Sequence, residues 1–141
     1  MFNQNMRRKS VRYSRGNLCV VVKRTGISGF VQKPHIVNWM DFSLYGMSFV
    51  SDLKFYLGDK LCIVLAIDDA KQEAVGDIIG IVKNTKRVQN GQYRYGVEFD
   101  FEANDYMRTD DVRNGLLTIE ESLKNIIQRM RKKHKSLVRE L

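Results

Sequence analysis

The chain has 141 residues, which is enough for one domain built around a single hydrophobic core. Its hydrophobic fraction of 43% and charged fraction of 28% are ordinary for a globular protein, and no stretch of it predicts a membrane span. The formal charge of +8 favours anionic partners such as nucleotides, nucleic acids, membrane surfaces or acidic protein faces.

The cysteines and histidines do not indicate a metal or redox centre. Cys19 and Cys62 each lie within an apolar run, as small buried side chains do. His35 and His134 are far apart in the sequence and lack the spacing of metal ligands, so we expect no metal site. The basic N-terminus is not followed by the apolar segment of a signal peptide, so the expected location is the cytoplasm.

Residues 1–16 are polar and basic, and we expect them to form a flexible arm because they can bury little apolar surface. Short apolar runs bounded by turn residues follow, and Asn90-Gly91 is the strongest hairpin signal in the chain. Strands do not alternate with helices, which argues against a parallel α/β sheet. Residues 17–102 are therefore predicted to form a mainly β unit, either a small antiparallel barrel or a sandwich. The expected strands cover residues 18–22, 36–40, 46–50, 60–66, 75–88 and 93–101.

Residues 103–141 are predicted to be a linker followed by a long amphipathic helix. Thr118 and Glu121 match a capping box, and apolar residues recur at helical spacing behind them. We expect the helix to run from about Ile119 to about Arg139, with its apolar stripe either packed on the β unit or paired with another copy of the chain. The basic cluster at residues 129–135 is interpreted as a solvated helix face.

Two short motifs carry the functional signal. Arg8 and Arg12 lie four positions apart in the basic arm, with Arg7 directly before them. Further along, Asp41-Phe42-Ser43-Leu44-Tyr45-Gly46 lies between two expected strands. In this order they resemble the two signatures of the PilZ domain family, Arg-x-x-x-Arg and Asp/Asn-x-Ser-x-x-Gly. The resemblance covers residues 7–101 and implies a six-stranded antiparallel barrel with a C-terminal helix that binds cyclic di-GMP.

The residue types suit such a ligand. An arginine guanidinium can pair with the O6/N7 edge of guanine, fork onto phosphate or stack on a base. Asp41 can accept from the N1–H and N2 amino groups of guanine, Ser43 offers a hydroxyl, and Gly46 allows positive φ or a close approach to the ligand. The resemblance implies that the ligand contacts are made by Arg8, Arg12, Asp41, Ser43 and Gly46, and that Arg7 favours an intercalated pair of ligands.

The resemblance further implies a non-enzymatic receptor that changes conformation on binding and relays the signal to a protein partner. No catalytic residues and no cofactor besides the ligand are expected, because the sequence contains no nucleophile–base pair or phosphate-cradling glycine loop. A homo-oligomer formed through the C-terminal helix is a further expectation. Two alternatives stay open, namely a ligand-independent PilZ-like adaptor and a small-barrel nucleic-acid-binding protein, which would stack bases on exposed aromatic side chains.

Overall fold

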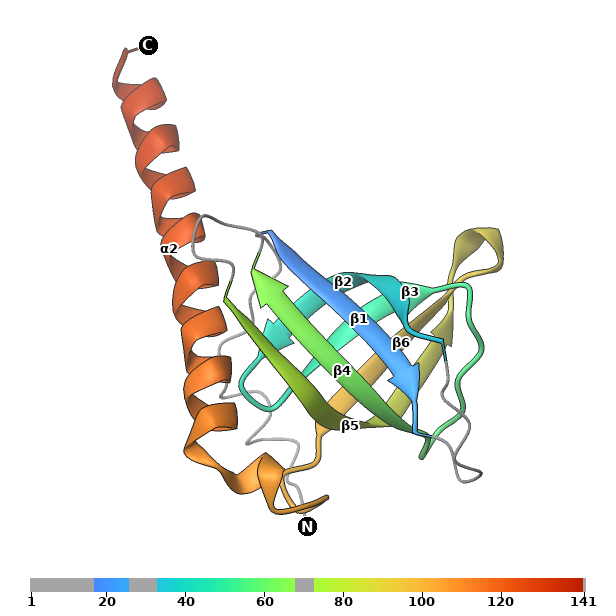
Figure 1. Ribbon diagram of the computed structural model, residues 1–141. Helices are drawn as coiled ribbons and strands as arrows, with labels where there is room; N and C mark the ends of the chain where they lie inside the picture. Colours follow the sequence, from blue (N-terminus) through green and yellow to red (C-terminus); the bar gives the residue numbers. More distant parts are fainter. Residues whose placement is uncertain (1–16, 26–32, 68–72, 141) are drawn as a thin grey trace.

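The computed structural model describes residues 17–25, 33–67 and 73–140, with side chains described up to residue 135. Within these ranges the chain forms a closed six-stranded antiparallel barrel and one long helix, α2 (Figure 1), which confirms the predicted fold class. The expected flexible arm lies outside the described residues. The strands are β1 (Leu18–Arg24), β2 (His35–Ser43), β3 (Gly46–Ser51), β4 (Lys60–Ile67), β5 (Ala74–Arg87) and β6 (Tyr93–Phe99), closed in the order β1-β2-β3-β6-β5-β4.

Alternating side chains fill the barrel interior. In β6, Tyr95, Val97 and Phe99 are buried while Gly96 and Glu98 between them are more exposed, as expected for a strand with one face in the core. The Tyr95 ring packs against those of Phe49 and Phe55, at centroid distances of 5.5 and 5.2 Å. Its hydroxyl donates to the Leu53 carbonyl (2.7 Å) and accepts from the Phe55 N–H (2.9 Å), which holds the β3–β4 connection against the core. Burial raises the pKa of Tyr95, so the phenol keeps its proton.

The predicted hairpin turn between β5 and β6 is confirmed. It contains the short 3-10 turn η1 (Gln89–Gly91). Asn90 and Gly91 have φ angles of 65° and 70°, a left-handed conformation that asparagine and glycine tolerate better than other residues. β6 ends at Phe99, two residues earlier than predicted, so Phe101 lies in the following turn.

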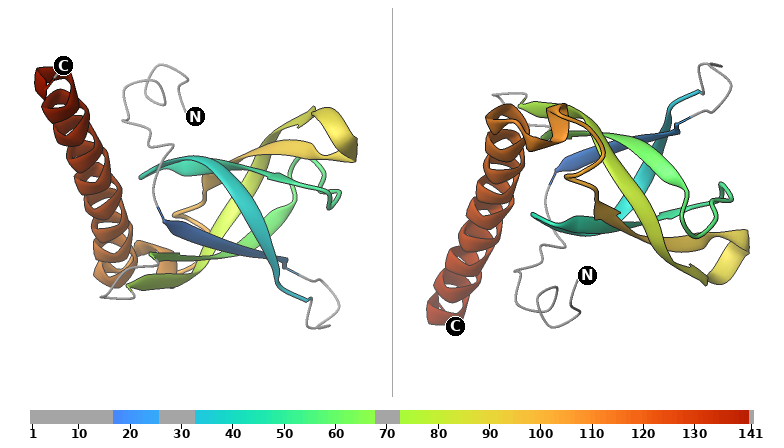
Figure 2. Two further views of the ribbon diagram at one scale, coloured as in Figure 1. Left: turned by 90° about the horizontal axis from the view of Figure 1, so that it is seen from above. Right: turned by 90° about the horizontal axis from the view of Figure 1, so that it is seen from below.

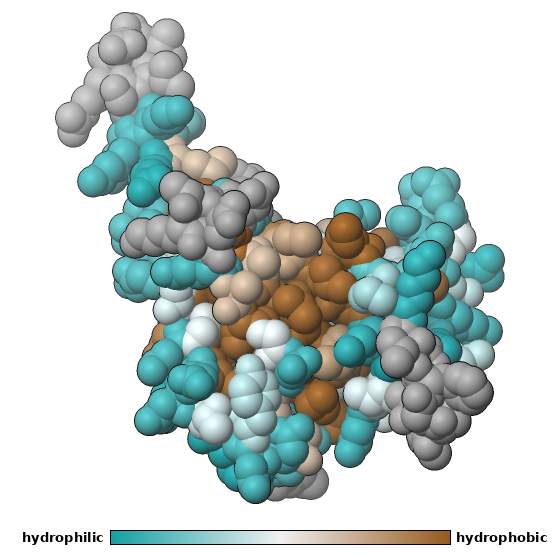
Figure 3. Space-filling model, viewed as in Figure 1, coloured by the Kyte–Doolittle hydropathy of each residue, from teal (hydrophilic) through white to brown (hydrophobic). Residues whose placement is uncertain are grey.

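The outer face of β1 and β4 is apolar. Val21 of β1 lies opposite Val64 of β4 and Ile36 of β2, and the Ile36 side chain is 78% exposed. The hydrophobic surface at the centre of Figure 3 covers this side of the barrel. Cys62 of β4 is buried, whereas Cys19 of β1 is half-buried. The expectation that both cysteines are small buried side chains is therefore fully met only by Cys62.

Several strand termini meet at one end of the barrel, which we call the helix end. Because neighbouring strands are antiparallel, β1 begins where β2 ends and β3 begins. Leu18 pairs with Ile67, and Ser43 pairs with Gly46. Helix α2 (Asp110–Glu140) lies across this end and then continues away from the barrel (Figure 2).

Helix α2 begins nine residues earlier than predicted, at Asp110 instead of Ile119. Thr118 lies inside the helix, so the predicted capping box is wrong. The residue before the helix is Thr109, whose backbone is extended and whose hydroxyl accepts from the Val112 N–H at 3.5 Å. The short 3-10 turn η2 (Tyr106–Arg108) leads into it.

The first turns of α2 bury their apolar side chains against the barrel interior. The buried residues are Val112, Leu116, Ile119 and Leu123. Gly115 lies among them, and a Cβ at this position would be 2.8 Å from the Cβ of Val75 in β5. The glycine is therefore required by the close approach of helix to strand, although glycine weakens helices.

We expect Gly115→Ala to lower the free energy of unfolding by about 1–2 kcal/mol, because the clash with Val75 outweighs the gain in helix propensity. Asn114→Ala is the matched control, since Asn114 is an exposed neighbour in the same helix and its replacement should not reduce stability. Urea unfolding of the three proteins measures both effects. A Gly115→Ala protein as stable as the wild type would show that the helix can shift away from β5 at no cost.

Candidate functional site

The second motif lies at the helix end of the barrel. Asp41 is near the end of β2, and Ser43 and Gly46 close the β2–β3 hairpin. Phe42 between them points into the core and is fully buried. The other predicted ligand residues, Arg7, Arg8 and Arg12, lie outside the described residues. The topology nevertheless fixes where the chain that carries them joins the barrel, because β1 begins at Leu18 at this same end.

Ser43 and Gly46 both have structural roles in the hairpin. The Ser43 hydroxyl accepts from the Tyr45 N–H at 3.2 Å and donates to the Gly46 carbonyl at 3.3 Å, and the residue is only 3% exposed. Gly46 does not have a positive φ. A Cβ there would instead lie 2.2 Å from the Val97 carbonyl oxygen, so the glycine lets β3 approach β6. Contact of either residue with a ligand stays a prediction.

Asp41 lies on the outer surface of the barrel beside a cation. Its carboxylate oxygen Oδ2 is 3.7 Å from Nη2 of Arg94 in β6, and the Asp41 side chain is 17% exposed. The same Arg94 nitrogen donates to the Ser48 hydroxyl at 3.4 Å. A partly buried carboxylate next to a guanidinium can offer both an acceptor and a donor to a polar molecule on this face.

The strand register extends this surface across four strands. Asp41 of β2 pairs with Ser48 of β3, Ser48 pairs with Gly96 of β6, and Gly96 pairs with Asn84 of β5. We call these four residues the polar row. A Cβ at Gly96 would be 3.1 Å from Nδ2 of Asn84, so a glycine here avoids a crowded contact and adds no side chain to this face. The row places the Asp41 carboxylate and the Asn84 amide on one face, whereas Ser48 between them is only 5% exposed. The carboxylate and the amide suit hydrogen bonding to a flat polar ligand.

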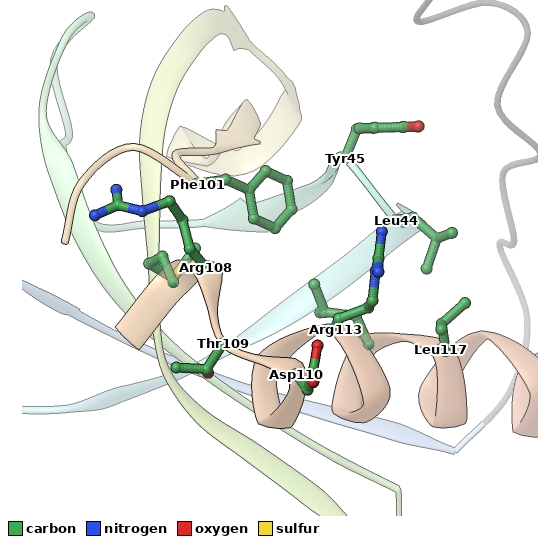
Figure 4. Close-up of a pocket in the computed structure, with 10 residues that line it drawn as sticks. Leu44, Tyr45, Phe101, Arg108, Thr109, Asp110, Arg113 and Leu117 are labelled. Carbon is green, nitrogen blue, oxygen red and sulfur yellow. The ribbon is translucent and has the colours of Figure 1, made fainter. Parts of the chain in front are cut away.

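A cavity of about 740 Å³ lies between the hairpin tip and the start of α2 (Figure 4). None of its lining residues was predicted as a site residue. The hairpin tip contributes Leu44 and Tyr45, which belong to the second motif but not to its defining positions. The remaining lining residues follow β6 in the sequence and are Phe101, Met107, Arg108, Thr109, Asp110, Arg113, Leu116 and Leu117.

Sequence reasoning also missed Arg94. Arg94 lies between the inward-facing Tyr93 and Tyr95, so the alternation along the strand indicates that it points outward. Its contact with Asp41 depends on the register of β2, β3 and β6, which cannot be derived from the sequence.

Two other features bear on the alternatives. Tyr95 and Phe99 are 0% and 3% exposed, so they cannot stack on bases, which weakens the nucleic-acid-binding reading. Within residues 17–25, 33–67 and 73–140 no cluster of three or more potential metal-ligating side chains is found. In the same part of the chain no helix is long and apolar enough to cross a membrane.

Similar solved structures exist, although no family model and no curated protein matches the chain. The PilZ domain with c-di-GMP of YcgR from Escherichia coli is 14% identical, with a TM-score of 0.61, over 90% of this chain and 98% of that one. The K. pneumonia MrkH–c-di-GMP complex is 16% identical, with a TM-score of 0.58, over 88% of this chain and 54% of that one.

A third similar structure is the Bacillus subtilis inhibitor of motility MotI/DgrA, which is 14% identical with a TM-score of 0.57 and is matched over 89% of this chain. The chain spans about half the length of this protein (52%), and likewise about half of MrkH (54%). At such low identities the likeness shows the architecture alone. The closed barrel, its strand order and the helix across its end give this chain the fold of a PilZ domain.

Proposed function

We propose that the chain is a cyclic di-GMP receptor. The observation that supports this proposal is that β1 begins, at Leu18, at the end of the barrel where Asp41 and the β2–β3 hairpin lie. Arg8 and Arg12 lie within ten residues of Leu18 in the sequence, so we propose that they reach this end of the barrel. The structures of YcgR and MrkH with a similar fold contain c-di-GMP, which supports the same ligand class here.

In this proposal the ligand lies on the polar row. Arg8 and Arg12 close over it from the arm, with guanidinium groups on guanine and phosphate, and Arg7 adds a stacking cation that favours an intercalated pair of ligands. Asp41 accepts from the Watson–Crick edge of guanine, and its neighbour Arg94 limits the charge repulsion between this carboxylate and the phosphates. Ser43 and Gly46 line the end of this surface while holding the hairpin in shape.

The signal follows from ordering of the arm. Binding energy is used to fix residues that carry the first motif, so ligand binding becomes a change in surface shape that a protein partner in the cytoplasm reads. No catalytic step is involved and no other cofactor is needed. The two alternatives make different predictions, because a ligand-independent adaptor does not bind the nucleotide and a nucleic-acid binder does not need Asp41.

The role of the arm can be tested by replacing the two arginines of its motif. Arg8→Ala and Arg12→Ala should each weaken cyclic di-GMP binding at least tenfold, that is by about 1.4 kcal/mol or more, because each removes a bidentate contact. Arg15→Ala is the matched control, since it removes the same charge from the arm outside the motif. Calorimetric titration with cyclic di-GMP, GTP and cyclic di-AMP measures affinity, selectivity and stoichiometry. Unchanged affinity in either motif variant would remove the arm from the site.

The preference for guanine should depend on Asp41. Asp41→Asn keeps the size of the side chain but replaces one acceptor by a donor, so it should reduce the preference for cyclic di-GMP over cyclic di-AMP by about tenfold. Asn84→Asp, at the other end of the polar row, is the comparison variant for the effect of charge alone. Competition titrations give the selectivity. Full discrimination by Asp41→Asn would assign Asp41 a different role.

Self-association should depend on the exposed part of α2. We propose that the part of α2 beyond the barrel pairs with a second copy, because Leu123 packs on the core whereas Met130, further along the same stripe, is 44% exposed. Met130→Asp, or truncation after Gln128, should lower the mass in solution without unfolding the barrel. Lys132→Asp on the opposite side of the helix is the control. Light scattering measures the mass of each protein in solution, and a monomeric wild type would refute the pairing.

A further inference from the structure

The roles proposed above leave the cavity at the helix end without a function. Its volume of about 740 Å³ is within the usual range for small-molecule sites. It is open to solvent along one side, where Tyr45 and Leu117 are 47% and 42% exposed. Leu116 and Met107 form its floor and belong to the core, so the cavity is built into the junction between barrel and helix.

The walls of the cavity suit a planar ring. Two aromatic side chains, Tyr45 and Phe101, line it together with Leu44 and Leu117. Flat apolar surfaces of this kind bind nucleobases by stacking and dispersion, with little dependence on which base is present. The preference for one base must therefore come from the polar groups at the same place.

The polar groups come from the start of α2. Arg113 extends from the helix toward the hairpin, and Asp110 lies beside it one turn earlier (Figure 4). Arg108 is engaged by Glu102, at 3.6 Å, and by Asp105. Arg113, in contrast, makes no ion pair within the described parts of the chain, so its guanidinium is available to a ligand.

Asp110 and Arg113 together match guanine. A carboxylate accepts from its N1–H and N2 amino groups, and a guanidinium donates to its O6 and N7 atoms. Adenine lacks this set of donors and acceptors. The cavity thus combines stacking walls with the two charged groups that a guanine base would need.

The cavity is also close to the proposed ligand surface. Tyr45 is four residues from Asp41, which is at most about 13 Å of extended chain, and the hairpin makes the separation shorter. A molecule that carries two guanines can therefore place one over the polar row and direct the other toward the cavity. We propose that the cavity takes a guanine base of the bound cyclic di-GMP, with Arg113 and Asp110 as further specificity residues. This inference rests on the proposed function.

The test compares two arginines of the same helix. Arg113→Ala should raise the Kd for cyclic di-GMP about tenfold, or reduce the number of ligands bound from two to one, because it removes a bidentate contact. Arg129→Ala removes the same charge about 24 Å further along the helix and should change the Kd by less than about twofold. Asp110→Asn should reduce the preference for cyclic di-GMP over cyclic di-AMP.

A second pair of variants tests whether the volume of the cavity is needed for binding. Leu117→Trp fills the cavity from its exposed edge, so it should weaken binding without loss of thermal stability, whereas Leu117→Ala leaves the cavity open and should weaken binding less. The inference is overturned if the wild type binds, Arg12→Ala does not, and both Arg113→Ala and Leu117→Trp bind like the wild type. A wild type that binds no cyclic di-GMP overturns the proposed function itself, and the inference with it.

Discussion

The contact between helix α2 and the open end of the barrel is the constraint on which the rest of the structure depends. A six-stranded barrel leaves apolar side chains uncovered where its strands end, and Val112, Leu116, Ile119 and Leu123 cover them here. The helix can lie this close because Gly115 has no side chain facing Val75. Burial of four aliphatic side chains contributes several kcal/mol, on the order of 1.5–3 kcal/mol for each.

The same contact determines where a ligand can bind. The β2–β3 hairpin, the start of β1 and the first turns of α2 all lie at the helix end, so groups far apart in the sequence become neighbours. Ser43 and Gly46 illustrate the consequence, because the hydrogen bonds of one and the missing Cβ of the other shape the hairpin that presents Asp41 and Tyr45. A motif of this kind can be required for folding and for recognition at the same time.

Much of this could be predicted from the sequence, because alternating side chains and strong turn residues are local signals. The Asn90-Gly91 turn is an example, and all six expected strands are present. The predicted start of α2 was wrong because Thr118 and Glu121 match a capping box, although both lie inside the helix. The tertiary contact with Val75, which explains the glycine at position 115, is not visible in the local pattern. Phe101 continues the alternation of β6, but the strand ends before it.

The site was predictable only where one segment contains the relevant residues. Asp41, Ser43 and Gly46 form such a segment. The ion pair of Asp41 with Arg94 depends on the register of three strands, and the cavity combines residues that are more than fifty positions apart. Neither can be read from a local pattern, since both exist only after the barrel has closed and the helix has packed.

The order of the elements along the chain has a consequence for biosynthesis. Domains form as the chain leaves the ribosome, N-terminal parts first, at about 5–20 residues per second. Helix α2 follows all six strands, so the helix end stays uncovered until β6 and the first turns of α2 have emerged. During that interval the nascent barrel exposes the apolar surface that α2 later buries, and this is the surface on which a chaperone would act.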